Sequence, residues 1–129
     1  MIKLCDRLIQ KYKIKKKNII GHSDIAPLRK IDPGEKFPWK YLAKNKVGIW
    51  HDYELNILKK FRRTKVLTQQ DKKKFIKNLN KIGYCLSVHN KAFFFKTVKA
   101  FQRHFRKELI NGILDRECFM IAQNLAKKL

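Results

Sequence analysis

Apolar residues recur at three- and four-residue steps in four stretches of the chain, and this period predicts amphipathic helices. The first stretch covers residues 2–13, where the lysine-rich end suits the negative C-terminus of a helix. The other three lie in the second half, at residues 68–82, at residues 91–105 and after Asp115. We therefore expect residues 68–129 to form a small all-α three-helix bundle.

Local signals mark the ends of these helices. Thr68 is expected to cap the helix of residues 68–82, with Asp71 at the third position inside it. Gly83 follows the last apolar residue and predicts its end. Asn111-Gly112 predicts a turn, and Asp115 can cap the final helix.

The segment after the first helix has a different pattern. Ile19-Ile20 reads as a short buried strand that ends at Gly21-His22, and residues 23–39 form a loop that holds all three prolines. One or two helical turns are expected within residues 39–46, and a short helical pattern runs through residues 52–66. The predicted fold is thus α/β over residues 1–58, a linker at 59–67, and the helical bundle at 68–129.

The loop carries residues with metal chemistry. His22 and Asp32 are candidate zinc ligands, and Lys30 lies between them in the sequence. Pro33 biases Asp32 away from helical backbone angles, and the Pro33-Gly34 turn can aim its carboxylate. Asp24 could accept the other imidazole N–H of His22 as an outer partner, or only cap a turn.

This loop resembles a segment of zinc-dependent N-acetylmuramoyl-L-alanine amidases of the amidase type 2 family, related to the anhydro-muropeptide amidases. The matching motifs are Gly21 to Pro27, Arg29 to Gly34 and Phe37 to Trp39, which together span about nineteen residues. The resemblance implies that His22 and Asp32 bind zinc and that Lys30 stabilises charge at the scissile amide. It also implies hydrolysis of the amide between N-acetylmuramoyl and L-alanine in peptidoglycan.

The second half resembles a peptidoglycan-binding domain of the three-helix type. The residues that carry this resemblance are Ala100 to Phe105 and Asn111 to Asp115. Similar domains often follow the catalytic domain in this subfamily, so the order agrees with the first resemblance. Peptidoglycan or muropeptides are therefore the expected partners.

A catalytic zinc site takes three protein ligands and an open position. The family's first zinc histidine and its catalytic glutamate are expected upstream, in a part of the domain that this chain lacks. We therefore expect a C-terminal amidase fragment that is inactive alone, although His51 could serve as a substitute ligand. The alternatives are a non-catalytic peptidoglycan-binding module, one half of a split amidase whose N-terminal half is encoded upstream, and a decayed gene product.

The charge of the chain is extreme. Its net charge is +22, and lysine outnumbers arginine 25 to 7. Such a charge attracts polyanions, including nucleic acid, lipid headgroups and wall polymers. However, the lysines are spread along the chain without a nucleic-acid-binding signature, so no specific nucleic acid is expected. Neither a secretory signal nor a transmembrane segment is visible, which predicts a cytoplasmic location for the chain as it stands, whereas a full-length relative could lie in the periplasm or cell envelope.

Overall fold

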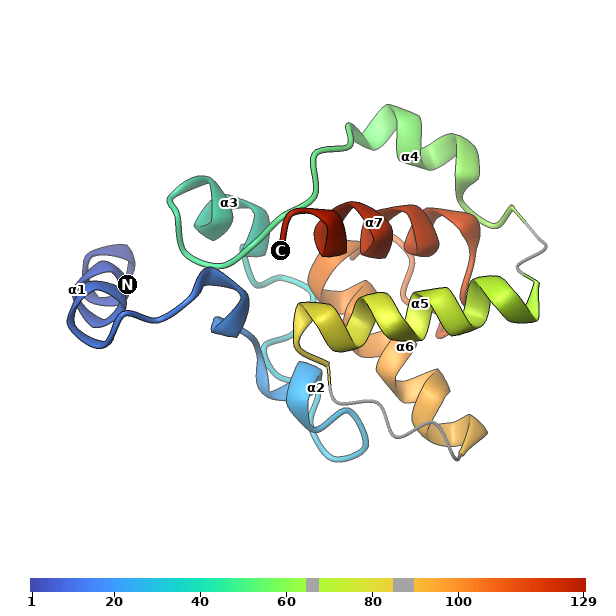
Figure 1. Cartoon of the computed structure of the whole chain (residues 1–129), viewed down its shortest axis with the longest axis horizontal. Coiled ribbons are helices and arrows are strands. Elements are labelled where there is room, and N and C mark those ends of the chain that lie inside the picture. The colour runs from blue at the N-terminus through green and yellow to red at the C-terminus, as the bar shows by residue number, and fades with distance from the viewer. Residues whose placement is uncertain (65–67, 85–89) are drawn as a thin grey trace.

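The computed structural model describes residues 1–64, 68–84 and 90–129, and within these ranges every regular element is a helix. Figure 1 shows their arrangement. The α-helices are α1 (Ile2–Tyr12), α2 (His22–Ile25), α3 (Trp39–Lys44), α4 (Leu55–Phe61), α5 (Gln69–Ile82), α6 (Lys91–Phe105) and α7 (Arg116–Lys127), and a 3-10 helix spans Lys16–Asn18.

The predicted α/β class is wrong, because the described residues contain no strand. Ile19, expected in a strand, does have extended backbone angles (φ −95°, ψ 97°). An extended segment becomes a strand only by hydrogen bonding to a neighbouring strand, and no described segment offers one. Ile19 packs instead beside Trp39 and Val47, and His22 begins a one-turn helix where a strand end was expected.

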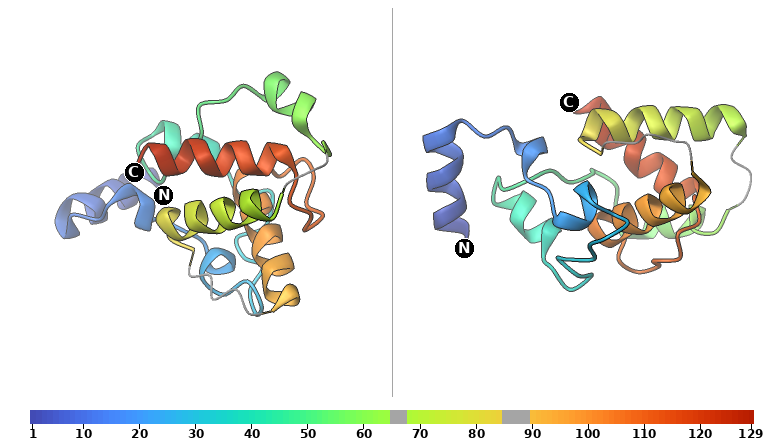
Figure 2. Two further views of the ribbon diagram at one scale, coloured as in Figure 1. Left: turned by 45° about the vertical axis from the view of Figure 1, so that its right-hand side comes forward. Right: turned by 90° about the horizontal axis from the view of Figure 1, so that it is seen from below.

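The three helices predicted in the second half are present. Helices α5 and α7 lie side by side, and α6 crosses beneath them (Figures 1 and 2). Their apolar faces meet in the main core, around Phe75, Phe101 and Ile121, none of which is exposed. No helix in the described ranges is both long and apolar enough to cross a membrane.

The predicted helix caps are confirmed. The Thr68 hydroxyl accepts the Asp71 backbone N–H at 3.1 Å, and the Asp71 carboxylate accepts the Thr68 N–H at 3.1 Å. Gly83 ends α5 with φ +123°, which a side chain would disfavour. Asp115 accepts the Cys118 N–H at 2.9 Å and so caps α7. The side chains therefore satisfy backbone groups that helix ends leave open.

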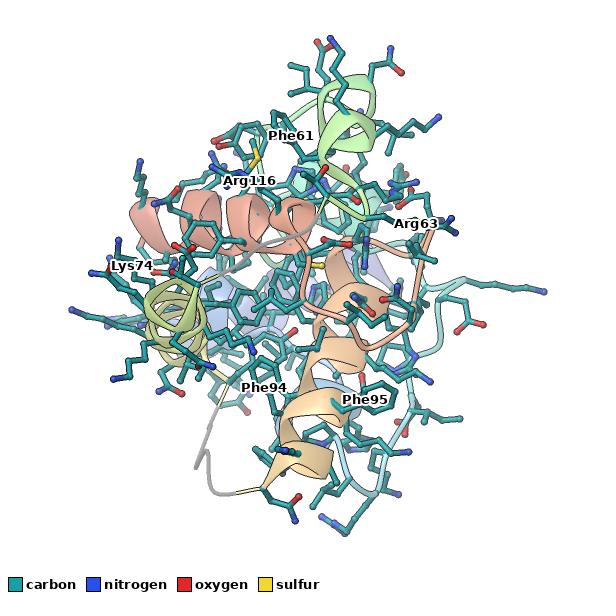
Figure 3. The ribbon with its side chains drawn as sticks, turned by 90° about the vertical axis from the view of Figure 1, so that its right-hand side faces the viewer. Phe61, Arg63, Lys74, Phe94, Phe95 and Arg116 are labelled. Carbon is teal, nitrogen blue, oxygen red and sulfur yellow. The ribbon has the colours of Figure 1, made fainter. Side chains whose placement is uncertain are left out.

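The turn before α7 depends on a glycine. Gly112 has φ +74°, and a Cβ atom there would come within 2.3 Å of the Phe95 ring. In Figure 3 the two neighbouring rings leave α6 on different sides, and Phe94 packs against the core. The predicted Asn111-Gly112 turn thus lies against α6, because only glycine lets the backbone approach the ring so closely.

A smaller cluster joins the N-terminal helix to the rest. Trp39, Leu42 and Val47 form its buried part, and Ile2, Cys5 and Ile9 of α1 pack against it half-buried. Helix α1 lies at one end of the molecule (Figure 2). Beside this packed face, the same helix carries apolar side chains that remain exposed: Leu4, Leu8 and Tyr12.

A cluster of buried ion pairs links α4, α6 and α7 at the edge of the main core. Arg62 donates two hydrogen bonds to the Glu117 carboxylate, each 2.8 Å long. Arg106 donates to Asp115 at 2.7 Å and to Glu117 at 3.1 Å. Glu117 and Arg106 are almost fully buried, so each of these charges depends on its partners.

The division into two domains stays a prediction, and residues 65–67 of the expected linker lie outside the described residues. Contacts nevertheless join the two predicted domains. Leu58 belongs to the main core of α5, α6 and α7, and Trp39 stacks on His104 of α6 with ring centroids 3.9 Å apart. The predicted N-terminal part therefore packs directly on the C-terminal helices.

Candidate active site

His22 and Asp32 come together in the structure. The Nδ1 atom of His22 and the Oδ2 atom of Asp32 lie 2.6 Å apart, and both side chains are more than half exposed. The loop between them is closed by a backbone hydrogen bond in which Ser23 N–H donates to the Asp32 carbonyl at 2.9 Å. Two side chains ten positions apart in sequence thus present a nitrogen and an oxygen donor at one point of the surface.

The environment keeps Asp32 charged. The hydrogen bond from His22 is the main cause that lowers the pKa of the Asp32 carboxyl below its usual value, and the charge of Lys30 adds to it. Lys30 itself is exposed, and its backbone N–H donates to the Ala26 carbonyl at 2.9 Å. Its positive charge favours the ionised form of Asp32, as a cation that stabilises negative charge at this site would do.

The donor set fits zinc in kind but not in number. An imidazole nitrogen and a carboxylate oxygen are both common zinc ligands, whereas a catalytic site takes three protein ligands. No group of three or more His, Cys, Asp or Glu side chains converges within residues 1–64, 68–84 and 90–129. His51 is not brought to the pair: it is buried beside Trp50 and Tyr53, and burial lowers its pKa to about 4.

Asp24 has partners other than His22. Its carboxylate accepts the Gly21 backbone N–H at 2.9 Å, the Tyr84 hydroxyl at 2.6 Å and a hydrogen bond from His104 Nδ1 at 2.7 Å. The first of these bonds caps the short helix that begins at His22, which was one of the two predicted roles. The other two attach the loop to the C-terminal helices.

Sequence reasoning missed Tyr84 and His104. Both are almost fully buried, and they lie 60 and 80 positions from Asp24. His104 is also sandwiched between Trp39 and Phe105, each with a ring centroid 3.9 Å away. The only available signal was a histidine on a helix rich in phenylalanine, which does not identify a partner. Buried polar groups are normally hydrogen-bonded, and here they fix the base of the loop.

Comparison with known proteins agrees with the motifs of the loop. No protein-family model matches the chain. The N-acetylmuramoyl-L-alanine amidase AmiD of Escherichia coli K12 is 36% identical over 133 residues, which cover 99% of this chain and 46% of AmiD. The 1,6-anhydro-N-acetylmuramyl-L-alanine amidase AmpD of Haemophilus influenzae is 57% identical over 35 residues, 26% of this chain and 19% of AmpD.

Solved structures give the same result. The complex of E. coli AmiD with anhydro-N-acetylmuramic acid-L-Ala-D-gamma-Glu-L-Lys matches with a TM-score of 0.80 and 34% identity, over 98% of this chain and 49% of that one. AmpDh3 from Pseudomonas aeruginosa also matches with a TM-score of 0.80 and 34% identity, over 98% and 50%. The chain thus spans about half the length of these relatives. It is homologous to N-acetylmuramoyl-L-alanine amidases of the AmiD and AmpD type.

Proposed function

We propose that the chain supplies the zinc-binding loop of an N-acetylmuramoyl-L-alanine amidase. The proposal rests chiefly on the 2.6 Å approach of His22 Nδ1 to Asp32 Oδ2, within a chain that is 36% identical to AmiD. In the proposed site these two side chains hold zinc, and Lys30 lies beside them. When bound, zinc supplies a water whose pKa is lowered toward ~7 and a Lewis acid for the amide carbonyl.

The residues of the chain have distinct tasks in this proposal. Asp32, ionised because His22 and Lys30 favour its charged form, is a ligand that needs no proton removed. Lys30 offers a fixed positive charge to the oxygen that becomes negative as the amide is attacked. Asp24 does not touch the metal, but it anchors the turn that begins at His22 to Tyr84 and His104.

The proposed substrate is a muropeptide or peptidoglycan, cut between N-acetylmuramoyl and L-alanine. The support is the homology, since solved relatives hold an anhydro-muramoyl peptide and an anhydromuramic pentapeptide. Residues 68–129 are proposed to form a peptidoglycan-binding unit. Because no third metal ligand joins His22 and Asp32 among the described residues, we expect these residues alone to lack useful activity.

Zinc titration by calorimetry tests the ligand pair. We expect one zinc per chain, with binding lost in His22→Ala and in Asp32→Ala. Glu35→Ala is the matched control, because Glu35 is an exposed carboxylate of the same loop. Lys30→Gln should keep zinc and lose the release of stem peptides from sacculi once the missing groups are supplied. Zinc binding that survives in both ligand variants would contradict the proposal.

A further inference from the structure

A cavity lies apart from His22 and Asp32, between α3 and the C-terminal end of α6. Its volume is about 300 Å³, roughly ten times the ~30 Å³ that one water occupies in the liquid and at the lower end of the range for small-molecule sites. Neither His22, Lys30 nor Asp32 lines it. The walls are mostly aromatic, with rings from Phe37, Trp39, Tyr41, Trp50, His104 and Phe105.

The rings are held in place by one another. Trp39 stacks on His104 with centroids 3.9 Å apart, and Phe37 meets Trp39 edge-on at 4.6 Å. Trp50 lies against Phe105 at 5.7 Å. Because this stacking leaves Trp39, His104 and Phe105 almost fully buried, the apolar surface open to a ligand comes mainly from Phe37, Tyr41 and Trp50.

The rim of this aromatic pocket is positively charged. Lys40, Lys44 and Lys107 line it and are exposed, whereas Glu108 is the one acidic residue in the lining. Glu108 in turn lies 3.9 Å from Arg62, which offsets part of its charge. A ligand with a carboxylate at the rim and an apolar or ring-shaped part inside would therefore complement the pocket.

Two buried nitrogens in the lining residues have no partner. Within the described residues, neither Trp50 Nε1 nor His104 Nε2 makes a hydrogen bond, and both are shielded from solvent. His104 already uses its Nδ1 atom in the 2.7 Å contact with Asp24, and Trp50 Nε1–H is a donor. Unpaired groups of this kind are rare in proteins and costly, so a ligand whose polar groups reached these nitrogens would gain by pairing them.

We propose that this aromatic pocket binds an acylated amino sugar that carries an acidic peptide, that is, the muramoyl end of a muropeptide. The sugar face packs on the rings, its acetamido and hydroxyl groups provide donors and acceptors, and the peptide carboxylate meets the lysine rim. The choice of muropeptide rests on the proposed function. The pocket would give the chain a contact with its substrate that is independent of the metal ligands.

Tryptophan fluorescence tests this directly, because the chain has two tryptophans and both line the pocket. The probe is N-acetylmuramoyl-L-alanyl-D-isoglutamine, titrated into the full chain in EDTA and at low salt. We expect a saturable change in emission that is also present in His22→Ala. Neutral N-acetylglucosamine and the free dipeptide each lack one half of the ligand, and each should bind at least tenfold more weakly.

Matched variants locate the contact. Lys107→Glu reverses a charge at the rim and should raise the Kd about tenfold, whereas Lys77→Glu, on the exposed side of α5, should leave it within twofold. Trp50→Phe keeps an aromatic ring, removes the N–H donor and should raise the Kd roughly fivefold, with Trp39 still reporting. No saturable change, equal effects of the two lysine variants, or equal affinity for N-acetylglucosamine would overturn the pocket assignment. Because zinc is absent, failure here is distinct from failure of the zinc titration.

Discussion

The hydrogen bond between Tyr84 and Asp24 offers a sharp test of how the loop is anchored. In Tyr84→Phe the ring remains against Phe101, and only the hydroxyl that donates to Asp24 at 2.6 Å is lost. Burial first, and then the charge of Asp24, raise the pKa of Tyr84 well above its usual value, so the hydroxyl stays a donor throughout the working pH range.

The expected cost follows from the partner's charge and burial. A hydrogen bond to a charged group contributes about 1.5–3 kcal/mol, and the upper part of this range applies because the Asp24 oxygen left behind is buried. We therefore expect Tyr84→Phe to lower the free energy of unfolding by about 2–3 kcal/mol. For a chain of this size, that corresponds to a fall in Tm of roughly 10 °C.

Urea unfolding followed by circular dichroism measures the change. Tyr41→Phe is the control, since Tyr41 is exposed, and it should stay within about 0.5 kcal/mol of the parent protein. In an Asp24→Ala background the Tyr84→Phe change should cost much less, because its partner is gone. If Tyr84→Phe is as mild as Tyr41→Phe, the hydroxyl does not support Asp24 and the anchoring argument fails.

Two further predictions concern buried charge. Glu117→Gln should lower the free energy of unfolding in urea by about 3–5 kcal/mol, because it leaves the half-buried Arg62 without its carboxylate partner. Glu108 is more exposed, so the control Glu108→Gln should cost under about 1 kcal/mol. Equal costs for the two variants would refute the argument. Burial, with the charge of Lys40, lowers the pKa of His51 to about 4, so the unfolded chain binds a proton from pH ~6.5 downward while the folded chain does not. Stability should therefore fall by at most about 3 kcal/mol between pH 6.5 and 4, and an unchanged slope in His51→Gln would contradict this.

Helices could be predicted because their signals are local. The apolar period of residues 69–82 and the reciprocal bonds of Thr68 and Asp71 involve neighbours within a few positions. Strand formation is not local, because it requires a partner elsewhere in the chain. Ile19-Ile20 has the apolar character of a strand, but the described residues provide no segment to pair with it.

The residues of the site also fall into a group that the sequence could predict and a group that it could not. The family resemblance of the loop implied that His22 and Asp32 act together, and the structure brings the two side chains together. Asp24 could not be assigned, since Tyr84 and His104 lie far away in sequence and no spacing rule connects them. Packing of α2 on α6 decides which polar groups meet, and this packing is settled only when the whole core assembles.

The exposed apolar stripe of α1 has a consequence for how the protein behaves in solution. Leu4, Leu8 and Tyr12 lie on one side of the helix and are 61%, 41% and 62% exposed, whereas the whole chain carries a net charge of +22. The charge repels other copies, and the stripe attracts apolar surface. Salt weakens only the first effect, because the Debye length shrinks from about 10 Å at 0.1 M to about 3 Å at 1 M. Dilute buffer therefore favours separate molecules, and concentrated salt removes the barrier that keeps these stripes apart.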